Sequence, residues 1–164
     1  MSFSLRPEYF TMDLLLITPE KLKSCNIENL LLDLDNTISP YLEEKPDLKL
    51  INWAKSMKDG GISLYIVSNS KKERPRIFAE GMGIPYIKHA RKPSPKNIKR
   101  AMSELGGRGD NTALAGDQIF TDILGANLAG IKSILVYPIK FSKVLYKIRY
   151  IIETPFRNSY KNKL

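Results

Sequence analysis

Short apolar runs alternate with helix-like segments along most of the chain, and this alternation constrains the fold more than any other feature. The runs end in polar or turn residues and span residues 30–34, 62–67, 86–87, 112–115 and 133–137. Apolar residues recur with helical spacing in residues 47–58, 72–82, 95–105 and 119–129. Glycines stand where those helices should end: Gly60, Gly83, Gly106 and Gly130. Strands that alternate with helices predict a five-stranded parallel α/β sheet with helices on both faces.

The length of 164 residues predicts one domain, residues 1–164, with its own core. Thr18 followed by Pro19 indicates a short extra helix in an N-terminal extension of residues 1–27. No apolar run approaches the roughly 20 residues that a membrane span needs. The one cysteine, Cys25, cannot form an internal disulfide, so we expect a reducing, cytoplasmic compartment.

Two carboxylates follow the first run directly, in the segment LLLDLDNT. Residues two apart in an extended segment point to the same side, so Asp33 and Asp35 can converge on one point. Two anions that close repel each other, and Mg²⁺ is the usual ion for an all-oxygen site. The alternative is a turn in which Asp35 and Asn36 cap the loop. In a parallel sheet, ligands bind at the carboxyl ends of the strands, where the strand order reverses.

The second run ends in Val67, Ser68 and Asn69. A hydroxyl and an amide at this position can donate hydrogen bonds to a phosphate, next to the N-terminus of the following helix. Ser and Asn are also common helix N-caps, so a capping role stays open.

A basic turn, His89 to Pro95, follows the third run. Lys92 precedes a predicted helix start at Ser94, so we expect an exposed lysine whose ammonium reaches into the crevice. We expect Arg91 to face outward and the lone His89 to be a surface residue.

The fourth run ends in AGDQIFTD. Gly116 permits a sharp exit, Asp117 stands at the strand tip, and Asp122 falls in the first turns of the next helix. Helix capping is an alternative role for Asp117 or for Asp122 taken singly. It accounts less well for the presence of both, together with Asp33 and Asp35 at the end of the first run.

The order of these motifs resembles that of the haloacid dehalogenase (HAD) phosphatase superfamily. Its four motifs are similar to residues 33–37, Ser68, Lys92 and residues 116–122, and the likeness spans residues from about 28 to 137. The resemblance implies a three-layer, Rossmann-like fold. The spacings from Asp33 to Ser68 and from Ser68 to Lys92 leave no room for a cap domain. An uncapped site suits a phosphate carried on something large.

The resemblance also implies a role for each residue. Asp33 is the expected nucleophile and Asp35 the expected general acid and base. Mg²⁺ is expected on Asp33, the Asp35 main-chain carbonyl and Asp117, with Asp122 supporting them. The expected contacts with the phosphoryl group come from three further residues: Ser68, Asn69 and Lys92.

Within the superfamily, the short chain resembles subclass IIIA phosphatases related to mitochondrial phosphatidylglycerophosphatases. This nominates phosphatidylglycerophosphate as a substrate. The alternatives are a phosphatase for phosphoproteins or nucleic-acid ends, and a non-catalytic binding module that keeps the fold. All catalytic residue types are present, which weighs against the binding module.

The net charge of +9 is concentrated in the C-terminal segment, residues 140–164. Residues 140–153 predict an amphipathic helix with one apolar arc of about 120°. Its members are Phe141, Val144, Leu145, Ile148, Ile151 and Ile152. This pattern fits an interfacial helix held at an anionic membrane on the inner face, and it fits equally a last helix whose arc packs on the sheet. We expect packing, with the basic flank and tail contacting the membrane. We expect the tail to lack the interleaved exposed aromatics and the Gly or Arg repeats of single-strand binders, which weighs against a nucleic-acid partner.

Overall fold

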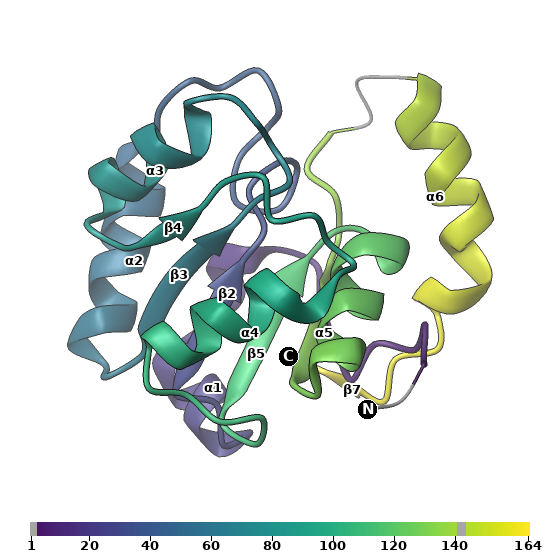
Figure 1. The fold of residues 1–164 in the computed structure, drawn as a ribbon, viewed down its shortest axis with the longest axis horizontal. Coiled ribbons are helices and arrows are strands. Elements are labelled where there is room, and N and C mark those ends of the chain that lie inside the picture. The colour runs from purple at the N-terminus through teal and green to yellow at the C-terminus, as the bar shows by residue number, and fades with distance from the viewer. Residues whose placement is uncertain (1–2, 141–143) are drawn as a thin grey trace.

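A computed structural model describes residues 3–140 and 144–164, and it shows one mixed α/β architecture (Figure 1). The sheet strands are β1 (Tyr9–Thr11), β2 (Asn29–Leu32), β3 (Ser63–Val67), β4 (Tyr86–Ile87), β5 (Thr112–Gly116), β6 (Lys132–Val136) and β7 (Asn162–Lys163). The α-helices are α1 (Pro19–Ser24), α2 (Leu48–Asp59), α3 (Arg74–Met82), α4 (Pro95–Glu104), α5 (Leu124–Ala129) and α6 (Val144–Arg157). Two short turns complete the elements, a 3-10 helix η1 (Leu14–Leu16) and a π-helical turn η2 (Ile119–Ile123).

The described strands form one parallel sheet in the order β4-β3-β2-β5-β6-β1-β7. The five predicted strands occupy its β4 to β6 part, but the sheet has seven strands and the prediction of five is wrong. The two additional strands are only three and two residues long, too short to leave an apolar run in the sequence. The chain runs outward from β2 through β3 to β4 and then crosses back to β5, so the strand order reverses between β2 and β5.

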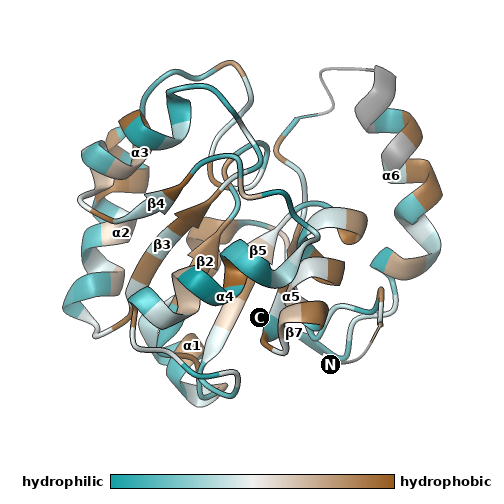
Figure 2. Ribbon diagram, in the orientation of Figure 1, coloured by the Kyte–Doolittle hydropathy of each residue, from teal (hydrophilic) through white to brown (hydrophobic). Residues whose placement is uncertain are grey.

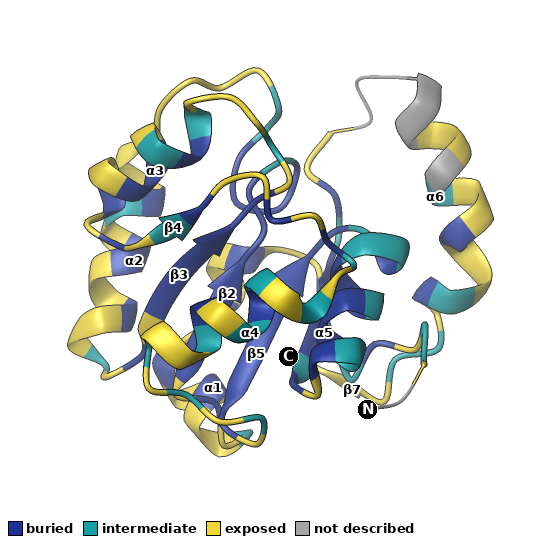
Figure 3. Cartoon of the chain, in the orientation of Figure 1, coloured by how far each residue is buried: buried dark blue, intermediate teal, exposed yellow. Residues whose placement is uncertain are grey.

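Helices cover both faces of the sheet. Leu30 and Leu32 of β2 share a buried cluster with residues of α1, α2 and α3, whereas Leu31 packs with residues of α4 and α5. After their first residues, Asn29 and Ser63, the central strands β2 and β3 are apolar and buried, while much of the outer surface of the helices α2, α3 and α4 is hydrophilic and exposed (Figures 2 and 3). This burial on both faces explains why the strand sequences read as continuous apolar runs instead of alternating ones.

Helix α6 lies at the side of the molecule (Figure 1). Phe141 and Lys143 of the predicted amphipathic segment lie outside the described residues, and the helix continues past Glu153 to Arg157. Its isoleucines are exposed, with 48% of Ile148, 69% of Ile151 and 57% of Ile152 accessible. The prediction that the apolar arc packs on the sheet is therefore wrong at these three positions. Across the described residues, the structure contains no helix with both the length and the hydropathy needed to cross a bilayer.

Candidate active site

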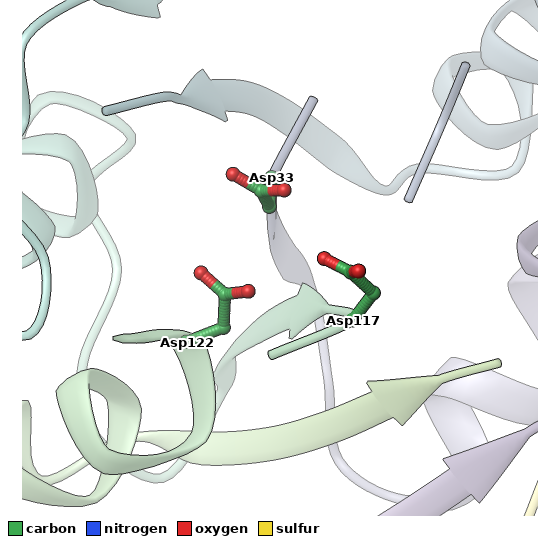
Figure 4. A group of neighbouring side chains, drawn as sticks. All are labelled: Asp33, Asp117 and Asp122. Carbon is green, nitrogen blue, oxygen red and sulfur yellow. The ribbon is translucent and has the colours of Figure 1, made fainter. Parts of the chain in front are cut away.

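Three buried carboxylates converge at the point where the strand order reverses (Figure 4). Asp33 directly follows β2, Asp117 directly follows β5, and Asp122 lies in η2. Each residue offers one carboxylate oxygen, and these oxygens lie within 4.8 Å of one another. The parallel topology thus brings together residues that are more than 80 positions apart, as we expected from the ends of β2 and β5.

The Lys92 ammonium lies between two of these carboxylates. Its Nζ is 2.5 Å from Asp33 Oδ1 and 2.8 Å from Asp122 Oδ1. The prediction of an exposed crevice lysine is wrong, because Lys92 is only 5% exposed. The lysine reaches the site as predicted, but as the buried counter-charge of the carboxylates.

Asn69 holds the main chain that carries this lysine. Its Nδ2 donates to the Lys92 carbonyl oxygen at 3.0 Å, and its Oδ1 accepts from the Lys92 N–H at 2.7 Å. Both hydrogen bonds of the amide therefore position the main chain of Lys92. Sequence reasoning missed this paired contact because the two residues lie on different loops, 23 positions apart.

The electrostatics of the cluster follow from burial and like charge. Burial raises the pKa of Asp122 to about 6, although the Lys92 ammonium opposes the shift. Burial, the Asp33 carboxylate and the Asp122 carboxylate together raise the pKa of Asp117 well above its usual value. Burial disfavours the Lys92 ammonium, but the carboxylates of Asp122 and Asp33 more than offset this and raise its pKa. Lys92 thus pairs with two of the three carboxylates, so the negative charges of the cluster outnumber its one ammonium.

The cluster has the donor set of a hard divalent cation. All three candidate ligands supply carboxylate oxygen, the type that Mg²⁺ prefers. Burial raises the pKa of Asp117 most, and the repulsion from Asp33 and Asp122 adds to it; a bound cation would remove that repulsion. Residues Asp33, Asp117 and Asp122 therefore fit a magnesium ion.

Close packing fixes Asp122 in this position. A Cβ atom at Gly116 would lie 2.4 Å from Asp122 Cγ, so only glycine leaves room for the carboxylate. The Gln118 N–H donates to Asp122 Oδ2 at 3.1 Å. The role of Gly116 is thus to admit the side chain of Asp122, in addition to turning the chain.

Thr37 links two of the carboxylates and was not singled out from the sequence. Its Oγ1 lies 3.3 Å from Asp33 Oδ2 and 3.4 Å from Asp117 Oδ1. The preceding Asn36 adopts a left-handed conformation with φ of 63°, which Asn tolerates better than most residues. The turn at Asn36 therefore directs Thr37 back toward the carboxylates.

Asp35 is not one of the three clustered carboxylates, and it forms an ion pair with Arg74 of α3. Arg74 also donates to the Pro40 carbonyl oxygen at 2.7 Å, so it ties the loop after β2 to α3. Burial raises the pKa of Asp35, and the Asp33 carboxylate raises it further, whereas Arg74 and Lys92 oppose this. No sequence signal connects Arg74 with Asp35, because their pairing depends on how α3 packs beside the loop.

Ser68 is buried at the end of β3. Its Oγ accepts a hydrogen bond from the Ser70 N–H at 3.1 Å, which leaves the hydroxyl proton for a ligand. The predictions that His89 is a surface residue and that Arg91 faces outward are confirmed, since both residues are exposed.

A cavity of about 530 Å³ is lined by Thr37, the residue whose hydroxyl lies near Asp33 and Asp117. Thr37 lines it together with Met12, Leu15 and Ile139, which come from the loops after β1, β2 and β6. The site therefore adjoins an open, partly apolar space at the carboxyl edge of the sheet.

Comparisons with known proteins agree with this architecture. The HAD-hydrolase-like family model matches residues 89–139, the stretch that contains Lys92, Asp117 and Asp122. Probable phosphatase YqeG of Bacillus subtilis is 40% identical over 136 residues, which cover 83% of this chain and 79% of that protein.

Solved structures of phosphatases share the fold. The cobalt-bound deoxy-D-mannose-octulosonate 8-phosphate phosphatase of Haemophilus influenzae has a TM-score of 0.59 at 14% identity, over 85% of this chain and 78% of that one. The 3-deoxy-D-manno-octulosonate 8-phosphate phosphatase of Moraxella catarrhalis, solved with magnesium, phosphate and KDO, has a TM-score of 0.54 at 14% identity. That match covers 83% of this chain and 92% of that one. At this identity the likeness concerns the fold alone, and it confirms the predicted fold class.

Replacement of Lys92 by Met should destabilise the metal-free protein strongly at neutral pH. The change keeps the side-chain volume but leaves buried carboxylates without their counter-charge, which typically costs about 3–5 kcal/mol of unfolding free energy. The loss should be smaller at pH 5, because carboxylates whose pKa is already raised take up protons there. Urea unfolding of wild type and variant at pH 7.5 and pH 5 measures both effects.

The matched control is Lys88→Met, which removes an exposed lysine paired with Glu73. An exposed ion pair contributes roughly 0–1 kcal/mol, so this variant should unfold almost like wild type. A Lys92→Met loss no larger than that of the control, or equal at both pH values, would contradict the counter-charge role.

Proposed function

The chain belongs to the HAD-like hydrolases and is a phosphatase of that type, and on this premise we propose that it is a Mg²⁺-dependent phosphomonoesterase working through an aspartyl-phosphate on Asp33. One observation carries the proposal. The Asp33 carboxylate lies at the reversal of strand order, bonded by Lys92 and Thr37 and next to two further buried carboxylates.

In the proposed reaction, Asp33 attacks the phosphorus atom and the bond from phosphorus to the leaving oxygen breaks. Asp35 donates a proton to that oxygen, a role favoured by the raised pKa of its carboxyl group. Asp35 then accepts a proton from water, which attacks the phosphorus and releases inorganic phosphate from Asp33. The fixed position of Asp33 at a strand end favours in-line attack.

The phosphoryl oxygens require positive charge and hydrogen-bond donors. We assign these roles to the Lys92 ammonium and the Ser68 hydroxyl, and we assign Asn69 the task of holding Lys92 in place. The carboxylates of Asp33 and Asp117 and the main-chain carbonyl of Asp35 would hold Mg²⁺, with Asp122 beside them. When bound, Mg²⁺ offsets the repulsion between the carboxylates and the incoming phosphate.

The proposed substrate is a phosphate on a large or membrane-borne group. The chain between Asp33 and Ser68 consists of a loop, α2 and β3, and the cavity beside Thr37 opens at the sheet edge. Large apolar side chains are exposed on the loops that follow the strands at this edge: Met12, Leu16, Leu42 and Ile139. Together with the exposed isoleucines of α6, they favour a lipid surface, and phosphatidylglycerophosphate is the narrower candidate.

We further propose peripheral contact with an anionic membrane on the cytoplasmic side. The isoleucines on the outer face of α6 can enter the headgroup region, while nearby lysines attract anionic lipid. Among the residues of this segment that the structure describes, the exposed lysines are Lys140, Lys147, Lys161 and Lys163. Arg157 is excluded from this set because it is buried and paired with Glu153.

Asp33→Asn should lower the hydrolysis of p-nitrophenyl phosphate by at least about a hundredfold, because the amide cannot act as the nucleophile. Circular dichroism should show that the fold is retained. The control Asp59→Asn makes the same change at an exposed position of α2 and should keep wild-type activity. A kcat for Asp33→Asn within tenfold of wild type would refute the assignment of the nucleophile.

Activity should disappear in EDTA and return when MgCl₂ is added in excess.

The stabilisation of the fold by Mg²⁺ should depend on pH. The folded-state pKa of Asp122, about 6, exceeds the unfolded value of about 3.9. The protonated acid therefore favours the native state below pH 4, and this contribution is lost as the pH rises through 6. Mg²⁺ should consequently raise the melting temperature more at pH 7.5 than at pH 5. Full activity in EDTA would remove the proposed metal dependence.

Wild-type protein should co-sediment with vesicles of anionic phospholipid at low salt and be released at high salt. Each exposed lysine contributes on the order of 1 kcal/mol near such a surface. A variant with four lysines changed to Gln should bind much more weakly; the sites are Lys140, Lys147, Lys161 and Lys163.

The control carries the same number of Lys→Gln changes on α1, α2 and α4, outside α6 and the C-terminal tail. The sites, all exposed, are Lys23, Lys49, Lys55 and Lys96. Equal binding by the two variants, or no binding by wild type, would count against the membrane proposal. It would favour a phosphoprotein or nucleic-acid substrate instead.

A further inference from the structure

The inward face of α6 carries a buried ion pair that no step of the proposed reaction uses. Arg157 Nη2 lies 2.9 Å from Glu153 Oε2, one helical turn away. Glu153 is fully buried, and Arg157 is 7% exposed. A charge pair removed from water in this way costs desolvation energy, so packing alone is a poor reason to place it there.

Both members of the pair bind the main chain of the segment that bears two of the site carboxylates. Arg157 Nη2 donates to the carbonyl oxygen of Asp117, and the Phe120 N–H donates to Glu153 Oε1 at 3.4 Å. The positively charged Arg157 thus contacts a carbonyl oxygen, and the negatively charged Glu153 contacts an N–H group. Each member of the pair therefore meets a backbone group of opposite polarity. Asp117 itself and Asp122 lie at the two ends of the segment.

Packing around the pair seats α6 on this segment. Phe156 packs against a buried cluster that includes Ile119 and Ile123 of η2, and its ring meets that of Phe120 at a centroid distance of 6.3 Å. The Arg157 guanidinium lies over the Tyr150 ring, 4.3 Å from its centroid. The guanidinium is therefore held on one side by α6 and directed on the other toward Asp117.

We propose that Glu153 and Arg157 are positioning residues that fix the segment 117–122, so that Asp117 and Asp122 are held in the geometry that binds the cation. This inference rests on the proposed role of Asp117 as a cation ligand. It assigns to α6, which lies outside the residues matched by the family model, a direct part in building the site. Groups that orient metal ligands typically change metal affinity or activity by roughly 10- to 100-fold when removed.

The first test is amide hydrogen exchange of the metal-free protein. In Arg157→Gln, the amides of residues 117–123 should exchange at least about tenfold faster than in wild type, while those of β2 and β3 keep their protection. Lys147→Gln, which removes an exposed positive charge from the same helix, should leave the exchange of these amides unchanged. This measurement needs neither Mg²⁺ nor a substrate, so it separates the inference from the proposed function.

The second test is calorimetric titration with MgCl₂. Arg157→Gln should raise the Kd for Mg²⁺ by roughly tenfold or more, and Arg157→Lys, which keeps the charge and one donor, should recover part of the affinity. With p-nitrophenyl phosphate at saturating Mg²⁺, KM should change less than kcat. If Arg157→Gln does not fold, Glu153→Gln provides the same comparisons with a smaller expected shift in the same direction.

The outcomes are distinct. Unchanged exchange of residues 117–123 with unchanged Mg²⁺ affinity would overturn the proposal, even if the melting temperature fell, because Arg157 would then act only in stability. If Arg157→Gln exchanges faster at residues 117–123 but the wild-type protein hydrolyses no phosphate ester, the proposed function is refuted and the positioning role stands.

Discussion

The repulsion among buried carboxylates is the constraint on which the rest of the site depends. Asp33, Asp117 and Asp122 are held together against their own charge, and the Lys92 ammonium bonds two of them. The sheet can hold them because they project from rigid strand ends and from a turn that α5 and α6 flank. The structure thus trades local stability for a cluster of three carboxylates and one ammonium, whose excess negative charge a divalent cation would offset.

Much of the fold could be predicted from the sequence, because burial on both faces turns each central strand into an apolar run. The predicted strand at residues 62–67 differs from β3 by one residue at its start, and the predicted helix at 95–105 differs from α4 by one residue at its end. The short strands β1 and β7 could not be predicted. They are held in the sheet by neighbouring strands and not by any pattern of their own.

The site was predictable to the extent that it depends on strand ends. Asp33, Ser68 and Asp117 stand where buried strands finish, so the topology alone brings them together. Contacts made by Arg74 and Arg157 depend on how helices pack beside those ends, across 39 and 40 residues of sequence. The burial of Lys92 could not be predicted for the same reason, because it depends on tertiary contacts, including the hydrogen bonds that Asn69 makes with the Lys92 main chain.

Helix α6 shows why periodicity identifies a face but not its surroundings. The isoleucine stripe is the more apolar side, yet it faces solvent, and the side that carries Glu153 and Arg157 is buried. A charged pair four residues apart can be buried when each member meets a backbone group of opposite polarity, as Asp117 and Phe120 provide here. The same helix therefore has an inner face bonded to the segment 117–122 and an outer apolar face exposed to solvent. If both proposals hold, membrane contact at the outer face and the positioning of Asp117 and Asp122 are coupled, because one helix carries both faces.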